Sequence, residues 1–342
     1  MAAQAVLGLD IGFHSIKAVE LARVNKTIQL VSLGSIPTPP RGLLSETTVD
    51  EKAMVDTILK LLHDMKATSK IVNTSLPESQ VYTRVIEVPK LSEKELASSI
   101  QWEAEQYIPL PISQVNLDYA VLGGEDNNSM HVLLVAAPRK IIDKYSRILA
   151  EAGVSLASVE TDAIAILRVI PKEVPESANL LLINIGANAS DICIVRKRIL
   201  TFVRTVPIGG DSFTRAISEE LGFNPAQSEE YKRTYGLDKE KLEGKVFASI
   251  QPVFHTIIEE IKKIQAFFRD HYANEELSSA IVYGGSARLP GLISYIAGET
   301  GVDLQVSNPF EDIEVHPSIK QQIEANSPSF AVSVGLALKD LI

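Results

Sequence analysis

The chain has 342 residues, a length that favours two or more compact lobes over one small domain. Its formal net charge of -10 gives little electrostatic support for binding nucleic acid or an anionic membrane surface. The single cysteine, Cys193, excludes an intrachain disulfide, and no uncharged apolar run approaches the roughly 18 residues of a membrane span. These features predict a cytosolic protein that reaches a membrane only through a partner.

The first 36 residues have the pattern of three short strands. The turn between the first two lies in "LGLDIGFHSIKAVEL", residues 7–21. Gly12 permits a positive φ and a close approach to a ligand, and the N–H groups of such a turn form an anion-binding concavity. Ser15 adds a hydroxyl donor, Lys17 a positive charge for a phosphate, and Asp10 a carboxylate for a hydrated Mg²⁺ ion. Taken alone, such a turn is more typical of a plain hairpin with a glycine bulge.

Residues 78–154 combine strand-like and helix-like runs, and this pattern predicts a compact α+β insertion. Ser92 and Glu95 form a capping box at the start of a helix, and Pro109 ends that helix. Two strand-like runs follow, and Pro138 opens a second helix. The insertion is therefore expected to carry a sheet and helices of its own.

The segment "LLLINIGANASDICIV" repeats the pattern of the opening hairpin. Its Asn184 aligns with Asp10 and its Gly186 with Gly12, an offset of 174 positions (184 − 10). A β-meander that occurs twice, each time followed by helices, predicts two related lobes that face each other across a cleft. Two such turns are able to grip one polyphosphate, and this favours a ligand site over two plain hairpins.

Two glycine pairs precede helices in the second half of the chain. Gly209 and Gly210 lie in "VPIGGDSF", ahead of a helix expected over 211–221. Gly284 and Gly285 lie in "VYGGSARLPGL", between a strand and a helix. Backbone N–H groups at the start of a helix bind phosphates. Both pairs are therefore candidates for contacts with the same ligand.

In this order, the elements resemble the actin/Hsp70/sugar-kinase ATPase superfamily, and within it the FtsA branch and the PilM family of type IV pilus assembly proteins. The resemblance spans nearly the whole chain, and "EAEQYIP" followed by "VNLDY" is similar to the small insertion of PilM rather than to anything in actin or Hsp70. The segments that carry it are "LGLDIGFHSIKAVEL", "SEKELASSIQWEAEQYIPLPISQVNLDY", "INIGANASDICIV", "VPIGGDSFTRAI", "SEEYKRTYG", "EEIKKIQAFFRDHY" and "VYGGSARLPGL".

The resemblance implies an α/β fold of the actin-like (ribonuclease H-like) class, duplicated into two lobes, with a small α+β insertion in the first lobe. Further helices are expected over 226–235 and 245–272. The implied parts are a first-lobe core at 1–77, 155–177 and 328–342, the insertion at 78–154, a second-lobe core at 178–224 and 274–327, and a helical subdomain at 225–273.

The resemblance also implies a site for ATP and Mg²⁺. His14 is expected to contribute only its backbone N–H, and Glu229 and Lys232 fit a solvated helix face as well as a ribose or base contact. Asp10 is the implied metal-binding residue. The implied nucleotide-binding residues are Asp10, Gly12, His14, Ser15 and Lys17 for phosphates and Mg²⁺, Asn184, Gly186 and Ala187 for the opposite phosphate side, and Gly209, Gly210, Asp211, Glu229, Lys232, Gly284, Gly285, Ser286 and Arg288 for the ribose and adenine.

Two departures from the superfamily pattern concern hydrolysis. Asn184 stands where a second acid is usual, and its loss is expected to weaken the positioning of metal-bound water. Asp162 stands near the position of the water-orienting glutamine of actin. The sequence therefore predicts ATP binding with slow or no hydrolysis, and it offers only Asp162 as a candidate catalytic position.

In proteins similar to PilM, the partner is the N-terminal cytoplasmic peptide of PilN, an inner-membrane protein. Trp102, Tyr107 and Ile108 are the candidates for contacting such a peptide, although core packing is the commoner fate of these residue types. The resemblance implies a cytoplasmic scaffold held at the inner face of the inner membrane by this partner, with ATP favouring one arrangement of the lobes. Contacts with other inner-membrane pilus components and self-association are also compatible with it.

Two other functions fit the same superfamily. An FtsA-like cell-division filament protein generally ends in an amphipathic membrane helix, and the sequence up to Ile342 has none. A sugar kinase or exopolyphosphatase needs a catalytic acid aimed at its substrate, which Asn184 and the compact insertion disfavour.

Overall fold

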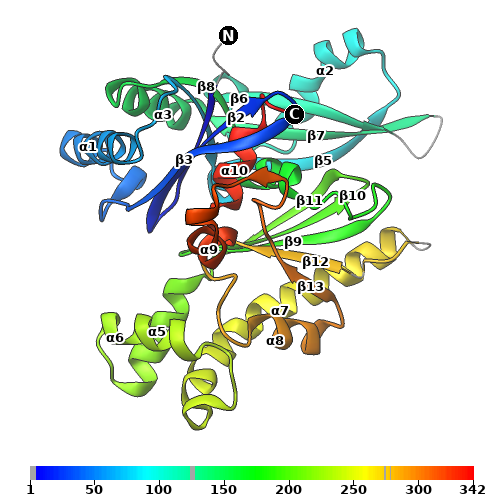
Figure 1. Cartoon of the computed structure of the whole chain (residues 1–342). Helices are drawn as coiled ribbons and strands as arrows, with labels where there is room; N and C mark the ends of the chain where they lie inside the picture. The colour runs from blue at the N-terminus through cyan, green and yellow to red at the C-terminus, as the bar shows by residue number, and fades with distance from the viewer. Residues whose placement is uncertain (1–4, 124–127, 273–274, 278) are drawn as a thin grey trace. The chain divides into compact units, whose positions relative to one another are not determined.

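The computed structural model describes residues 5–123, 128–272, 275–277 and 279–342 (Figure 1). The polar segment "GGEDNNS", which the sequence predicts as the loop between the two strand-like runs of the insertion, falls largely on residues 124–127, outside the described ranges. The chain divides into two compact units. Unit 1 comprises Met1–Arg168, Ile199–Val203 and Val332–Ile342, and unit 2 comprises Val169–Arg198 and Arg204–Ala331.

Unit 1 is built on a mixed sheet with the order β3-β2-β1-β4-β8. Its first three strands form an antiparallel meander, and β1, β4 and β8 run parallel. The strands are β1 (Ala5–Ile11), β2 (Ser15–Val24), β3 (Thr27–Pro37), β4 (Ile71–Leu76) and β8 (Ser155–Thr161).

The three parallel strands of unit 1 end along one edge of the sheet. Leu9 of β1 lies beside Thr74 of β4, and Thr74 lies beside Val159 of β8. Asp10 follows Leu9 directly, and Asp162 follows the last residue of β8. Both acids therefore lie at the carboxyl edge of the sheet, where open α/β sheets bind their ligands.

Helices cover both faces of this sheet. On one face, α1 (Thr48–Asp64) and α3 (Arg139–Glu151) lie side by side and bury an apolar core with Leu7 and Leu9 of β1 (Figure 1). On the other face, α10 (Ala331–Leu338) approaches Gly8 so closely that a Cβ there would lie 2.1 Å from the Ser333 carbonyl oxygen. Only glycine permits this packing. The short helix α4 (Asp162–Ile166) follows β8.

The insertion of unit 1 has its own antiparallel sheet, with the order β5-β7-β6, and its own apolar core. Its elements are β5 (Tyr82–Pro89), α2 (Glu93–Glu105), β6 (Val115–Gly123) and β7 (Ser129–Pro138). The predicted capping box of Ser92 and Glu95 starts α2. However, α3 packs through Tyr145 and Leu149 into the core of the main sheet. The apolar core of the insertion is therefore formed without α3.

Unit 2 contains β9 and β10 as an antiparallel hairpin, with β12 parallel to β9 and β13 parallel to β12. The last residues of β11, Arg204–Val206, belong to this unit, and β11 lies next to β10. The strands are β9 (Asn179–Ile185), β10 (Ser190–Arg196), β11 (Ile199–Val206), β12 (Ser279–Tyr283), β13 (Asp303–Val306) and β14 (Ile313–Glu314).

The helices of unit 2 follow these strands, and the longest, α7, buries one apolar face that includes Ile250, Ile257 and Phe268. The helices are α5 (Gly210–Leu221), α6 (Pro225–Tyr235), α7 (Lys245–His271), α8 (Leu292–Thr300) and α9 (Pro317–Asn326). The short 3₁₀ helices of the chain are η1 (Gly42–Leu44), η2 (Glu78–Gln80), η3 (Ile112–Gln114), η4 (Leu167–Val169), η5 (Lys241–Gly244) and η6 (Ser327–Phe330).

None of the helices within the described residues is both long and apolar enough to cross a membrane.

Candidate functional site

The glycine turn of unit 1 is a tight β1–β2 connection. The Gly12 N–H donates to the Ser15 carbonyl at 3.1 Å, and a Cβ on Gly12 would lie 2.9 Å from that same oxygen. Gly12 does not have the positive φ that the sequence led us to expect. Glycine is required here because of this close backbone approach. The Phe13 and His14 side chains are exposed at the tip of the turn.

Asp10 and Lys17 face each other across this hairpin. They are register partners of β1 and β2, and the Lys17 ammonium lies 3.6 Å from the Asp10 carboxylate. Their side chains are only 15% and 14% exposed. Burial raises the pKa of Asp10, and the charge of Lys17 opposes that rise. The hairpin thus holds an anion-binding cation and a carboxylate next to a glycine turn.

Asp162 begins α4 at the carboxyl edge described above. Tyr145 of α3 is completely buried, and burial together with the charges of Asp162 and Asp10 raises the pKa of its hydroxyl. The charges of both acids therefore raise the pKa of the same buried tyrosine. On the neighbouring connection, buried Glu78 accepts from the Ala163 N–H at 3.3 Å.

The glycine turn of unit 2 repeats the geometry of the first turn. The Gly186 N–H donates to the Ala189 carbonyl at 3.0 Å, and a Cβ on Gly186 would lie 3.0 Å from that oxygen. The duplication therefore extends from the sequence to individual backbone hydrogen bonds. The Ser15 position of the first turn is an alanine here, so this copy lacks the hydroxyl donor.

The second hairpin does contain a carboxylate, which the sequence reasoning missed. Asp191 on β10 is the register partner of Asn184 on β9, and the Asn184 amide donates to it at 3.1 Å. The Thr205 hydroxyl donates to the other carboxylate oxygen at 2.7 Å. Burial raises the pKa of Asp191, although both hydrogen bonds lower it. The signal was present in "SDICIV", where Asp191 is the one charged residue and is followed directly by four apolar residues.

The glycine pair Gly209–Gly210 packs directly on this turn. The Gly210 and Asp211 N–H groups each donate at 2.9 Å, to the Gly186 and Ala187 carbonyls respectively. A Cβ on Gly209, the N-cap of α5, would lie 2.4 Å from the Ala187 carbonyl oxygen. The start of α5 is therefore held against the glycine turn by contacts that only glycine permits.

Lys232 of α6 is buried beneath the start of α5. Its ammonium donates to the Gly210 carbonyl at 3.0 Å, to the Thr214 hydroxyl at 2.8 Å and to the Glu229 carboxylate at 2.5 Å. Burial acts to raise the pKa of Glu229, but the hydrogen bonds from Lys232 and Thr214 outweigh it and the pKa is lowered. Arg233 also donates to Glu229, at 2.7 Å. These charges are an organised network rather than a solvated helix face.

The glycine pair Gly284–Gly285 also reaches this region. Gly284 has a φ of +93°, and a Cβ there would lie 2.3 Å from the Asn184 side-chain oxygen. The Ser286 N–H donates to the Ile185 carbonyl at 3.1 Å. Gly285 is exposed beside them. Arg288 is exposed and donates to the Glu324 carbonyl at 2.6 Å, so its guanidinium is engaged elsewhere in unit 2.

Unit 2 thus brings together nearly all of its predicted site residues, from four separate segments of the chain. The predicted residues that contact one another, or lie next in sequence to those that do, are Asn184, Gly186, Ala187, Gly209, Gly210, Asp211, Glu229, Lys232, Gly284, Gly285 and Ser286.

A hydrated Mg²⁺ ion needs only one or two protein carboxylates, because it keeps most of its water. In the described part of the chain, no three His, Cys, Asp or Glu residues gather in the way of an all-protein metal site. Asp10 offers one carboxylate in unit 1 and Asp191 one in unit 2. Taken by itself, each of these carboxylates fits a Mg²⁺ ion that keeps most of its water, and neither fits a tightly caged metal.

The three partner candidates have different environments. Trp102 projects from α2 with 73% of its surface exposed, and Tyr107 is 36% exposed with the Arg84 guanidinium 4.7 Å from its ring centre. Ile108 is 7% exposed and packs in the core of the insertion. The Ile108 side chain is covered by its neighbours, and its contact with a peptide stays a prediction.

Two α/β units that carry the same glycine hairpin define an actin-like protein, and solved structures of this class share the fold. Over residues 8–341 the chain matches the family described as type IV pilus assembly protein PilM, and it belongs to that family.

Three similar proteins illustrate this relationship. The solved "PilM-PilN type IV pilus biogenesis complex" contains a chain that is 31% identical, with a TM-score of 0.87 and 98% of both chains covered. Cell division protein FtsA of Bacillus subtilis is 20% identical over 373 residues, covering 96% of this chain and 82% of that protein. MreB 5 of Spiroplasma citri bound to AMPPNP is 14% identical, with a TM-score of 0.56, and the match covers 99% of this chain and 96% of that chain. At this identity, the similarity shows a shared fold alone.

Proposed function

We propose that this PilM-family chain is an ATP-binding scaffold of type IV pilus assembly. The observation that carries the proposal is the twofold occurrence of one glycine turn, with Gly12 N–H bonded to Ser15 in unit 1 and Gly186 N–H bonded to Ala189 in unit 2. Such turns are suited to phosphates because their backbone can approach an anion without a side chain in the way. The binding of AMPPNP by an actin-like neighbour, MreB 5, supports the same ligand class.

In this proposal, the two glycine turns have different roles in nucleotide binding. The first turn binds phosphates through its backbone, Ser15 and Lys17, while Asp10 holds a water ligand of Mg²⁺. In unit 2, the glycine turn takes the opposite phosphate side, and the network of Glu229 and Lys232 with the start of α5 takes the ribose and base.

Hydrolysis is proposed to be slow. Asp191 restores a carboxylate to the second hairpin, but both of its oxygens already accept hydrogen bonds, from Asn184 and Thr205. Asp162 has a shorter side chain than the glutamine that orients water in actin. The nucleotide would then act by favouring one conformation of the scaffold, which is a shift of populations rather than a chemical step.

The partner in this proposal is a PilN-like inner-membrane protein, bound through its N-terminal cytoplasmic peptide. The similar chain in the solved PilM-PilN complex supports this partner. In the insertion, Trp102 and Tyr107 present the exposed aromatic surface that anchors peptides. The scaffold would then work in the cytoplasm at the inner face of the inner membrane.

The nucleotide proposal is tested by a thermal-unfolding assay of the full chain with ATP, with and without Mg²⁺. Binding to the folded state raises the free energy of unfolding by about 2.7 kcal/mol at a ligand concentration of 100 Kd, and the unfolding midpoint rises with it. We expect a shift that requires both ATP and Mg²⁺ and that is absent with a sugar or with polyphosphate alone. No shift at millimolar Mg-ATP, or rapid turnover that depends on an added phosphate acceptor, contradicts the scaffold proposal.

A further inference from the structure

A segment of unit 1 that we name the strap, Thr38–Thr47, begins on the glycine turn. The Thr38 N–H donates to the His14 carbonyl at 3.0 Å, and the Thr38 hydroxyl donates to the Gly12 carbonyl at 2.7 Å. Both hydrogen-bond donors of Thr38, its N–H and its hydroxyl, thus bond carbonyls of the turn. Any ligand that reorients the peptide units of the turn acts on Thr38 directly.

The first half of the strap is stiff. Pro37 precedes it, and Pro39 and Pro40 fix two of its φ angles. The Gly42 N–H donates to the Pro39 carbonyl at 2.8 Å and closes this part into a compact turn. Gly42 has a φ of +46°, which a side chain would strain. Because few soft dihedral angles remain, a displacement of Thr38 is passed along the strap rather than absorbed within it.

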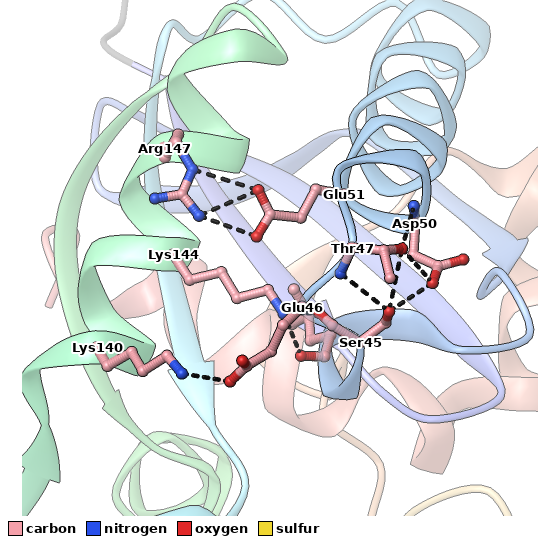
Figure 2. A network of polar contacts seen from close by, with 9 residues as sticks. Ser45, Glu46, Thr47, Asp50, Glu51, Lys140, Lys144 and Arg147 are labelled. Atoms are coloured by element: carbon pink, nitrogen blue, oxygen red, sulfur yellow. Dashed lines mark hydrogen bonds and ion pairs between the residues drawn. The ribbon is translucent and has the colours of Figure 1, made fainter.

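The far end of the strap is bonded to α3 (Figure 2). The Lys144 ammonium donates to the Leu43 carbonyl at 2.7 Å and to the Ser45 carbonyl. Lys140, one helical turn earlier, pairs with Glu46. The strap therefore rests on the basic face of α3 through main-chain acceptors and one ion pair.

The strap ends in a second anchor on α1 (Figure 2). The Ser45 and Thr47 hydroxyls both donate to the Asp50 carboxylate and hold its pKa below the usual range. The next residue of α1, Glu51, accepts a bidentate pair from Arg147 of α3, with distances of 2.9 and 3.3 Å. Because α1 and α3 are tied together here, the strap delivers its displacement to a rigid pair of helices.

The helix α3 is the direct continuation of the insertion. Its first residue, Arg139, follows Pro138, the last residue of β7, without a loop. β7 is the central strand of the insertion sheet. A movement of α3 is therefore a movement of the strand on which the insertion is built. Hydrogen bonds and the chain itself thus form one continuous path from the Gly12 carbonyl to this sheet.

We propose that the strap couples the glycine turn of unit 1 to the insertion, with Thr38 and Lys144 as its positioning residues. The coupling rests on the proposed function, since it needs an anionic ligand at the turn. A phosphate that draws the N–H groups of the turn toward itself reorients the Gly12 and His14 carbonyls that Thr38 holds. The strap carries that change to Lys144 and α3, and so to the peptide-binding surface of the insertion.

The test is hydrogen–deuterium exchange of the full chain with and without saturating Mg²⁺ and AMPPNP. In the unsubstituted protein we expect slower exchange at the glycine turn, in the strap and in α3, by about 5-fold or more in α3. Thr38→Val keeps the shape of the side chain and removes its donor, and in this variant we expect the slowing in α3 to be lost. Lys144→Met is expected to give the same loss in α3 while the strap remains protected.

Matched controls separate coupling from general loosening. Thr27→Val removes a threonine donor at the opposite end of β3, where the hydroxyl bonds the Val24 carbonyl at 3.2 Å. Lys52→Met removes an exposed lysine of α1 that pairs with Asp56 at 3.3 Å. We expect both controls to keep the full response in α3.

The possible outcomes are distinguishable. No protection at either glycine turn in the unsubstituted protein overturns the proposed function itself. Protection at the turns without any change in α3, or an undiminished response in Thr38→Val and Lys144→Met, overturns the coupling and leaves nucleotide binding intact.

Discussion

Lys17 and Asp191 occupy equivalent positions in the two glycine hairpins (191 − 174 = 17), yet they carry opposite charges. Lys17 lies across from Asp10 on β1, and Asp191 lies across from Asn184 on β9. Next to its glycine turn, each hairpin therefore holds one buried or nearly buried carboxylate, on its first strand in unit 1 and on its second strand in unit 2. The second hairpin therefore carries an acid next to its turn, but on the opposite strand from the acid of the first hairpin.

Removal of the charged pair in unit 1 is expected to abolish the thermal shift by Mg-ATP. Lys17→Ala deletes a charge-assisted hydrogen bond to phosphate, a contact of about 1.5–3 kcal/mol, or roughly 10- to 100-fold in affinity. Asp10→Ala deletes the carboxylate proposed to hold Mg²⁺. The measurement is the unfolding midpoint at fixed Mg-ATP for each variant.

Lys26→Ala is the matched control, because Lys26 is an exposed lysine in the adjacent β2–β3 turn. It is expected to retain the full shift. If both Lys17→Ala and Asp10→Ala shift as the unsubstituted chain does, the ligand does not bind at this turn.

The sequence predicted the repeated hairpin because a glycine turn between two strands is a local feature, readable from neighbouring residues. It did not predict Asp191, since the fold pairs that residue with Asn184 only through the register of β9 and β10. The network of Lys232 with the Gly210 carbonyl joins residues 22 positions apart. No local pattern shows that a lysine on one helix is buried under the start of another.

On α2, the spacing of apolar residues in the sequence predicts which side chains are buried. Leu96, Ile100 and Ala104 recur every four residues on the buried face of α2, and Ile108 continues that series into the core. Trp102 lies off this stripe and is exposed. Ile108 and Tyr107 both lie beyond Glu105, the last residue of α2, so helical spacing alone does not show that Ile108 is buried while Tyr107 is partly exposed.

Asp191→Asn is expected to change how stability depends on pH. Burial raises the folded-state pKa of Asp191 above its usual value of 3.8, so the folded chain keeps this proton to higher pH than the unfolded chain. Stability therefore falls as pH rises through that interval, and the unfavourable contribution is complete above the folded pKa. At pH 7 the asparagine variant should unfold at the same midpoint as the parent or higher.

The measurement is the unfolding midpoint of both proteins between about pH 4 and pH 8. The difference between variant and parent should shrink toward low pH, as Asp191 becomes protonated in the unfolded state as well as in the folded state. A variant that is less stable at pH 7 than at pH 4, relative to the parent, contradicts this account. With Mg-ATP, the variant should also show a smaller shift than the parent, because it lacks the carboxylate of the second hairpin.

Gly209→Ala is expected to damage unit 2 at the junction of two glycine turns. Its Cβ would lie 2.4 Å from the Ala187 carbonyl oxygen and 2.7 Å from that of Gly186, so backbone has to move. Such overpacking costs about 1–3 kcal/mol, and the movement should weaken Mg-ATP binding as well. Gly298→Ala in α8 meets nothing within 4 Å and should instead stabilise the chain by about 0.5–1 kcal/mol. Equal midpoints for the two variants would show that the close approach at Gly209 is relaxed in solution.

Trp102→Ala is expected to weaken the binding of a synthetic PilN-type N-terminal peptide without weakening the fold. The side chain is 73% exposed, so its removal should leave the unfolding midpoint unchanged. Aromatic anchors at interfaces contribute about 2 kcal/mol or more, which corresponds to roughly 30-fold in Kd. Isothermal titration calorimetry with the peptide provides the measurement.

Two further substitutions show whether the loss is specific to the surface of the insertion. Val49→Ala on α1 removes an apolar side chain that is 76% exposed, and it should alter neither stability nor peptide affinity. Ile108→Ala should lower stability by about 2–5 kcal/mol, because this residue fills the core of the insertion. If Trp102→Ala binds the peptide as tightly as Val49→Ala does, the peptide docks on another surface, and α2 is then excluded as its anchor.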